Sequence, residues 1–310
     1  MARDNELSTM ECIDVAEQLA ELGCRRVSMI GGEVFMRKDW KQIVSKLTGL
    51  GISVNIITNG FFFNEGLIED LMSSRVESVS VSVDGPKEIH DRLRQEGSFK
   101  RAMEAVSVLS NSSVPVSVIS TLNRENVESL ERLYEILLPF PIFAWQLQAC
   151  SPMGNAASNK IDYSFDFAKV INFVNHKAPK APFAVGVADN IGYFTKEEGS
   201  IRAGASTNAF FKGCSAGISA IGIDSVGNVR GCESMYDDFF TEGNLRKQSL
   251  AEIWNNPDNF AYNRHFTADM LTGNCKECKI GKYCGGGCRS YNYFVHKKLY
   301  ESPFCARYGH

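Results

Sequence analysis

Residues 275–288 read CKECKIGKYCGGGC, and this stretch decides how the last third of the chain folds. Its four cysteines stand in the order C-x2-C-x5-C-x3-C. A tight turn inside a C-x2-C pair points both thiolates at one metal centre, and the glycines at 285–287 let the backbone pass close to a bulky group. Thiolates are soft ligands that select zinc, copper(I) or iron–sulfur clusters. The C-x2-C pair alone leaves zinc and iron open.

Further cysteines extend the pattern in both directions. Cys214 and the G-x4-C unit of Gly227 and Cys232 precede the run and Cys305 follows it, so seven of the ten cysteines lie in residues 214–310. The polar N-terminus shows no signal peptide, which makes the cytoplasm the default compartment. Thiols stay reduced there, so dense cysteines indicate cluster or metal ligands before disulfides. The remaining three fit no ligand spacing and are interpreted as buried structural thiols: Cys12, Cys24 and Cys150.

The bulk composition is that of an ordinary soluble globular protein. Of the 310 residues, 44% are hydrophobic and 22% are charged, and the formal net charge is −3. This balance gives no basic surface for nucleic acid. No apolar run approaches the roughly 20 residues that span a bilayer. The sequence therefore predicts neither a nucleic-acid partner nor a membrane.

Strand and helix patterns alternate over the first half of the chain. We expect strands at 27–30, 53–58, 78–84, 115–121 and 143–148, and helices at 9–22, 39–49, 64–73, 99–110 and 127–138. The first helix opens with Ser8 and Glu11 at capping-box spacing. The strands are mostly continuous apolar runs, which is typical of strands buried on both faces. The alternation predicts an α/β fold with a parallel sheet, either open or closed into a barrel.

The chain divides into three predicted parts. Residues 1–150 form the α/β part, 151–213 form a bridging region with one helix at 165–176, and 214–310 form a small cysteine-rich domain with one helix at 249–254. A small domain with little regular structure cannot bury much apolar surface, so it needs metal to hold it together.

The complete cysteine order resembles the SPASM domain, a twin-cluster extension of radical S-adenosylmethionine enzymes that modify peptides and proteins. That family pattern is C-x9–15-G-x4-C, then C-x2-C-x5-C-x3-C, then a final C; every spacing here fits it, with twelve residues between Cys214 and Gly227. The resemblance implies two auxiliary [4Fe–4S] clusters. The first takes three cysteines (Cys214, Cys232 and Cys288), and the second takes four (Cys275, Cys278, Cys284 and Cys305). Some members carry a further cysteine for the first cluster, but residues 207–210 hold none.

Motifs in the first half resemble the barrel of the same enzymes. Gly31-Gly32-Glu33 looks like the family's GGE motif, whose loop receives the amino group of S-adenosylmethionine, although Val34 replaces the usual proline. Polar residues also end the following strands, where α/β barrels bind ligands, but Asn-Gly and Asp-Gly are common turn formers as well. The S-adenosylmethionine contacts that the resemblance implies are Gly31, Gly32, Glu33, Asn59, Ser82, Asp84, Arg94 and Gln148. Arg94 is expected to pair with the carboxylate of the cofactor.

Glu233 is the one candidate for proton transfer. It follows the expected ligand Cys232, and a desolvated carboxylate there could accept a proton from substrate. An ordinary solvated glutamate is the alternative.

The resemblance implies radical chemistry on a peptide or protein: a 5′-deoxyadenosyl radical abstracts hydrogen, and an external donor such as a flavodoxin or ferredoxin supplies electrons. The family's C-x3-C-x2-C, which binds a third [4Fe–4S] cluster and through it S-adenosylmethionine, occurs nowhere in the sequence, and the chain opens with a helix. We therefore expect a partial parallel (β/α)6 TIM-like barrel without its first strand, and no reductive cleavage of S-adenosylmethionine by the chain as written. Two alternatives are a catalytically dead cluster-binding scaffold and a zinc-stapled α/β binding protein.

Overall fold

The computed structural model describes residues 3–202 and 211–308, and the chain separates into two compact units. The first unit comprises residues 1–147 and 180–185, and the second comprises residues 148–179 and 186–310. The division of the sequence at 150 and 213 stays a prediction.

Six strands form one sheet whose order follows the sequence. They are β1 (Arg26–Met29), β2 (Ser53–Thr58), β3 (Ser78–Ser82), β4 (Val116–Leu122), β5 (Ala144–Ala149) and β6 (Ala184–Val187). The first four pair in parallel, which confirms the predicted α/β class and the five expected strands. The sixth strand was not expected, because its four residues lie in the stretch interpreted as a bridging region and bury only two side chains.

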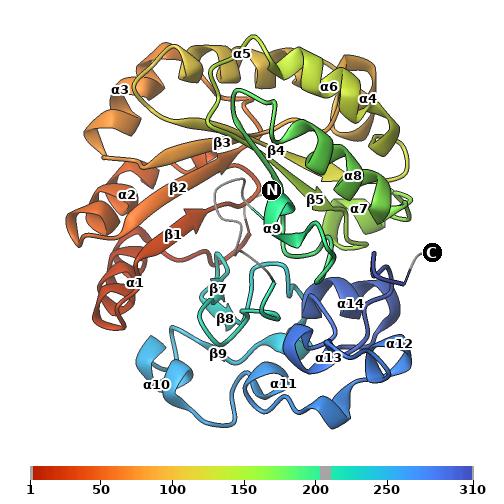
Figure 1. Ribbon diagram of the computed structural model, residues 1–310. Helices are drawn as coiled ribbons and strands as arrows, with labels where there is room; N and C mark the ends of the chain where they lie inside the picture. The colour runs from red at the N-terminus through yellow and green to blue at the C-terminus, as the bar shows by residue number, and fades with distance from the viewer. Residues whose placement is uncertain (1–2, 203–210, 309–310) are drawn as a thin grey trace. The chain divides into compact units, whose positions relative to one another are not determined.

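Helix α1 (Thr9–Glu21) precedes the first strand, the other helices of the first unit follow strands, and Figure 1 shows them along one side of the sheet. They are α1 (Thr9–Glu21), η1 (Val34–Met36), α2 (Trp40–Gly49), α3 (Glu65–Ser73), α4 (Lys87–Leu93), α5 (Ser98–Ser110), η2 (Val127–Ser129) and α6 (Leu130–Leu137). The capping box is present as predicted: Ser8 accepts from the Glu11 amide, and the Glu11 side chain accepts from the Ser8 amide. The sequence does not predict α4 or η1, and the helix expected at 127–138 is present as the turn η2 followed by α6.

Burial along the strands differs from the prediction. The first four residues of β3 are buried, but β2 alternates between buried and half-buried positions, and β1 buries none of its side chains. Helix α5 packs on β3 and β4 through fully buried Val106 and Leu109, so the core lies under the middle strands. Burial on both faces is therefore correct for β3, whereas β2 buries only every second side chain although it has a neighbour on each side.

The second unit is built from short elements. They are α7 (Gly154–Ser158), α8 (Phe167–Lys177), α9 (Glu198–Ile201), the antiparallel strands β7 (Gly222–Ile223), β8 (Asn228–Arg230) and β9 (Gly243–Asn244), η3 (Asp238–Phe240), α10 (Leu250–Asn255), α11 (Ala261–Arg264), η4 (Ala268–Met270), α12 (Gly273–Lys276), α13 (Gly281–Cys284) and α14 (Arg289–His296). The helices expected at 165–176 and 249–254 are present as α8 and α10. Across the described parts of both units, no helix has the length and apolar character needed to cross a membrane.

Candidate functional site

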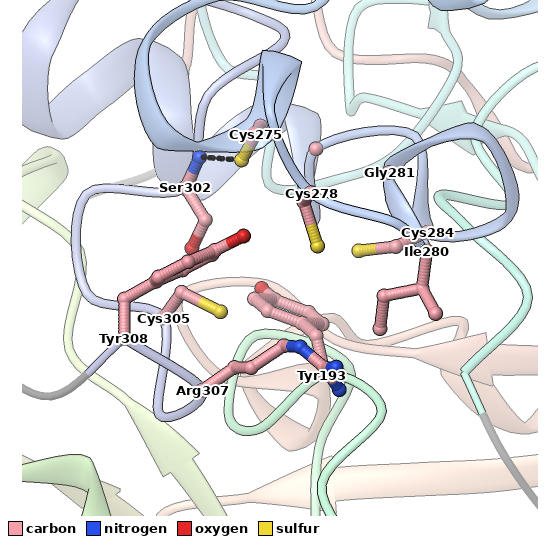
Figure 2. Close-up of a pocket in the computed structure, with 11 residues that line it drawn as sticks. Tyr193, Cys275, Cys278, Ile280, Gly281, Cys284, Ser302, Cys305, Arg307 and Tyr308 are labelled. Atoms are coloured by element: carbon pink, nitrogen blue, oxygen red, sulfur yellow. Dashed lines mark hydrogen bonds between the residues drawn. The ribbon is translucent and has the colours of Figure 1, made fainter.

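Four of the C-terminal cysteines border one cavity of the second unit. Cys275 lies in α12, Cys278 follows that helix, Cys284 ends α13, and Cys305 comes from the segment after α14. Figure 2 shows the side chains of Cys278, Cys284 and Cys305 turned into this space. We call these four residues the outer group; they are the cysteines that the resemblance gives to the second auxiliary cluster.

The outer group has the chemistry of a site for a soft metal or an iron–sulfur cluster. Burial, reinforced by the neighbouring Cys305 and Cys275, raises the pKa of Cys284 to about 12, so this thiol is neutral until a cation displaces its proton. The Ser302 amide donates to Cys275 Sγ at 3.4 Å, as second-shell donors to cluster sulfur do. Within residues 3–202 and 211–308, no three His, Cys, Asp or Glu side chains converge on a single-ion site. Thiols arranged around a cavity suit a larger inorganic group.

The other three cysteines also gather, and we call them the inner group. Cys214 and Cys232 pack against the same apolar cluster, which contains Met235 and Phe240. Burial, followed by the nearby Cys214, raises the pKa of Cys288 to about 12. Burial likewise raises the pKa of Cys232, with Cys288 among the charges that act on it. Residues 207–210, where a fourth cysteine would stand in some relatives, lie outside the described part of the chain.

The glycines at 285–287 connect the two groups and serve a purpose that the sequence did not indicate. All three have positive φ angles. A Cβ on Gly286 would lie 2.6 Å from the Tyr300 backbone, and one on Gly287 would lie 3.0 Å from the ring of Tyr193. The close approach that demands glycine is therefore made by the protein itself.

Arg289 was not predicted as a site residue, although it follows Cys288 directly. Its guanidinium is buried, donates to the carbonyls of Gly285, Gly287 and Leu299, and lies over the ring of Tyr300. No carboxylate pairs with it among the described residues. A buried cation without a counter-ion suits a place beside thiolate-bound clusters, which carry net negative charge.

In the first unit, Glu33 ties the loop after β1 to the end of β2. Its carboxylate accepts from the Thr58 hydroxyl at 2.8 Å, from the Asn59 amide at 2.9 Å and from the Phe35 amide at 3.3 Å. The side chain is buried. Glu33 thus holds the Gly31-Gly32 loop at the carboxyl end of the sheet, which is where the predicted site lies.

Asp84 and Arg94 form an ion pair at the end of β3. Asp84 Oδ2 accepts from Arg94 Nε at 2.6 Å, and Oδ1 accepts from the Thr121 amide at 2.8 Å. The two Nη groups of Arg94 make no hydrogen bond within the described residues and remain available to a ligand carboxylate. Both carboxylate oxygens of Asp84 already accept hydrogen bonds, so Asp84 is placed to orient Arg94.

His90, which the sequence did not single out, supports this pair from α4. Its Nδ1 accepts from the Asp84 amide at 3.0 Å, and burial lowers its pKa to about 4. A histidine that stays neutral at physiological pH can hold this acceptor role. No signal in the sequence separates it from an ordinary core histidine.

The remaining predicted residues are less closely engaged. Ser82 ends β3 and is half-buried, and Gln148 lies near the end of β5, also half-buried. Asn59 uses its side-chain oxygen to accept from the Phe61 amide, which is turn chemistry. Glu233 is exposed and accepts from the Cys232 thiol at 3.0 Å. Nothing in this arrangement distinguishes Glu233 from a solvated carboxylate.

Comparison with known families identifies both halves of the chain. Residues 2–137 match the model of the radical SAM superfamily, and residues 214–279 match SPASM, an iron–sulfur cluster-binding domain. The chain therefore carries a radical SAM domain followed by a SPASM domain. Its two domains imply that this radical SAM protein binds iron–sulfur clusters and S-adenosylmethionine. An iron–sulfur domain at the cysteines also favours iron over the zinc alternative.

Similar proteins include enzymes with different substrates. The chain is 27% identical over 312 residues to an AdoMet-dependent heme synthase of Methanosarcina barkeri, covering 97% of this chain and 87% of the relative. It is 26% identical to the mycofactocin maturase MftC of Mycolicibacterium smegmatis, covering 94% and 72%. Streptococcus suis SuiB has a similar fold: its structure with S-adenosylmethionine has a TM-score of 0.76 at 17% identity, covering 97% and 70%, and its structure with the precursor peptide SuiA has a TM-score of 0.74 at 16% identity, covering 97% and 69%.

Proposed function

We propose that the chain is of the radical SAM/SPASM type, whose enzymes modify a peptide or protein substrate by radical hydrogen abstraction. As written, without C-x3-C-x2-C, the chain would bind the auxiliary clusters but would not itself cleave S-adenosylmethionine. The observation that carries this proposal is the separation of the seven C-terminal cysteines into an outer group around one cavity and an inner group nearby. Two such groups beside a radical SAM domain suit an enzyme that needs auxiliary clusters. Relatives named as maturases, and SuiB with its precursor peptide, support a peptide substrate.

Each group is assigned one auxiliary [4Fe–4S] cluster. The outer cluster would have complete ligation by Cys275, Cys278, Cys284 and Cys305, and the inner one would have three cysteine ligands (Cys214, Cys232 and Cys288). Bound clusters supply substrate binding or one-electron transfer, and the protein contributes position, charge and exclusion of water. No residue of the chain is assigned to the third cluster.

The S-adenosylmethionine contacts are proposed at the carboxyl ends of the first strands. There the loop held by Glu33 offers backbone groups at Gly31 and Gly32, and Asp84 orients the Nη groups of Arg94 toward a carboxylate. Asn59, Ser82 and Gln148 remain further proposed contacts, and Glu233 remains the proposed proton acceptor. A flavodoxin or ferredoxin is the proposed electron donor.

A porphyrin substrate is the second candidate. The heme synthase similarity extends over 97% of the chain, whereas the match to the maturase SkfB of Bacillus subtilis covers 54%. A peptide enzyme and a porphyrin enzyme differ in a property that is simple to measure: only the latter changes the visible absorption of an added porphyrin.

The first experiment is an iron and sulfide determination on the full chain after anaerobic reconstitution. Two [4Fe–4S] clusters give about eight irons per chain and a brown protein with broad visible absorption. A colourless protein that retains zinc and takes up no iron contradicts the proposal. Titration with a porphyrin then separates the two substrate classes, since an unchanged porphyrin spectrum supports the peptide.

A catalytically dead scaffold predicts a different pair of results. Such a protein takes up the same iron but does not bind S-adenosylmethionine. Equilibrium dialysis with labelled S-adenosylmethionine tests this directly, and Arg94→Met serves as the matched variant because its change removes the free Nη donors without touching a cysteine. Binding that is lost in the variant supports the enzyme; absent binding in the parent supports the scaffold.

A further inference from the structure

Cysteine ligation of a cluster at the inner group leaves the buried hydroxyl of Tyr262 unexplained. Its oxygen is buried beside the Gly231 backbone, which is placed to donate to it, but no acceptor for the hydroxyl proton lies within reach among the described residues. A buried hydroxyl whose proton has no acceptor destabilises the fold. Such a group in a folded protein calls for a partner.

The surroundings of this hydroxyl indicate what the partner is. Tyr262, Cys214 and Cys232 pack against one apolar cluster, and both thiols act electrostatically on the phenol. Gly231 directly precedes Cys232, and a Cβ on Gly231 would lie 2.1 Å from Tyr262 Oη. Glycine at this position therefore gives the hydroxyl its place next to Cys232.

The phenol is also held in position by contacts that lead back to the inner group. The Tyr262 carbonyl accepts from the Tyr300 hydroxyl at 3.1 Å and from Arg289 Nε at 3.4 Å. The next residue, Asn263, donates to the carbonyls of Cys214 at 3.1 Å and of Ala216 at 2.8 Å. These bonds fix α11 against the segment that carries Cys214, so the hydroxyl cannot turn freely to water.

We propose that the Tyr262 hydroxyl donates a hydrogen bond to a sulfur atom of the cluster bound by Cys214, Cys232 and Cys288, and thereby raises the reduction potential of that cluster. The inference rests on the proposed function, because it requires a cluster at the inner group. Thiolate and sulfide sulfur are acceptors, and hydrogen bonds to them stabilise the more negative reduced state. The cluster in turn offers an acceptor to a hydroxyl proton that has none among residues 3–202 and 211–308.

The test is a redox titration, monitored by EPR, of the reconstituted full chain and its Tyr262→Phe variant. We expect one of the two midpoint potentials to move to a more negative value while the other stays, with unchanged iron content. The control is Tyr293→Phe, which removes a hydroxyl from the same apolar cluster but one that donates to Asp237 at 3.1 Å. The control should leave both potentials in place.

Two outcomes overturn the inference. If neither potential moves in Tyr262→Phe, the hydroxyl does not contact the cluster. If the variant loses iron or gains a three-iron signal, Tyr262 is an iron ligand and not a donor. A parent protein that binds only one cluster contradicts the proposed function instead, and this is seen before any variant is made.

A second measurement on the parent does not depend on how the variant folds. Reconstitution in D2O replaces the hydroxyl proton by deuterium, so an exchangeable proton coupling of the reduced inner cluster should disappear from pulsed EPR spectra. Cys232→Ser identifies which spectrum belongs to the inner cluster. A spectrum that is the same in H2O and D2O overturns the inference.

Discussion

Replacing Glu33 by glutamine tests whether this side chain holds the loop after β1 to the end of β2. The carboxylate accepts hydrogen bonds from the Thr58 hydroxyl and from the amides of Asn59 and Phe35. A glutamine amide has one oxygen, so it can face either the Asn59 amide or the Thr58 and Phe35 side. In both orientations its NH2 group meets another N–H, and one buried donor loses its acceptor.

The expected magnitude follows from that loss. A buried donor without a partner costs about 1–3 kcal/mol. A loss of about 1–2 kcal/mol raises the equilibrium constant for local opening of the loop by a factor of roughly 5–30. Hydrogen exchange measured by mass spectrometry on peptides covering 33–36 and 58–62 should show faster exchange of the Phe35 and Asn59 amides by that factor.

The matched control is Glu17→Gln, which makes the same chemical change at the half-exposed partner of Lys46. An exposed ion pair contributes about 0–1 kcal/mol, so exchange in the two peptides should not change. The reasoning is refuted if the Glu33 variant exchanges no faster than the Glu17 variant. That result would mean that the loop and strand are held by other contacts.

Three further predictions concern the cysteine groups and the Asp84 pair. In reconstituted protein, Cys284→Ser and Cys288→Ser should each lower the iron content by about four irons per chain, which is the loss of one cluster. The control Cys12→Ser should leave the iron content unchanged. If either substitution removed both clusters, the outer and inner groups would not be independent. The free energy of unfolding of the first unit should fall by about 1 kcal/mol per pH unit as the pH drops from 6.5 toward 4. The reason is that the unfolded chain binds a proton at His90, whereas the folded protein, in which the pKa of His90 is about 4, does not. Urea melts of the parent and of His90→Gln over this pH range check this, and the same dependence of stability on pH in both proteins would refute it. Removing iron with a chelator should make the second unit susceptible to limited proteolysis while the first unit stays intact. Residues 214–308 contain only short helices and strands, so their packing depends on the clusters. If the second unit resisted the protease equally well with and without iron, the prediction would be wrong.

Much of the fold follows from local patterns that can be read from the sequence alone. The five strands before residue 150 were predicted because β-branched runs are recognisable over a few residues, and α1 was predicted because Ser8 and Glu11 cap it within four positions. The seven-cysteine order likewise depends only on spacing. It indicated the SPASM domain before any contact was known, and the family comparison supports it.

Only the tertiary structure decided the features that depend on residues far apart in the chain. Strand β6 lies in the stretch interpreted as a bridging region, and it forms because the sheet offers it an edge at β5. The acceptor role of His90, the orientation of Arg94 by Asp84 and the place of Tyr262 over Gly231 have no local signature. The reason is physical: spacing along the chain determines which thiols can share a metal, but burial and hydrogen bonding of a side chain depend on neighbours that folding brings to it.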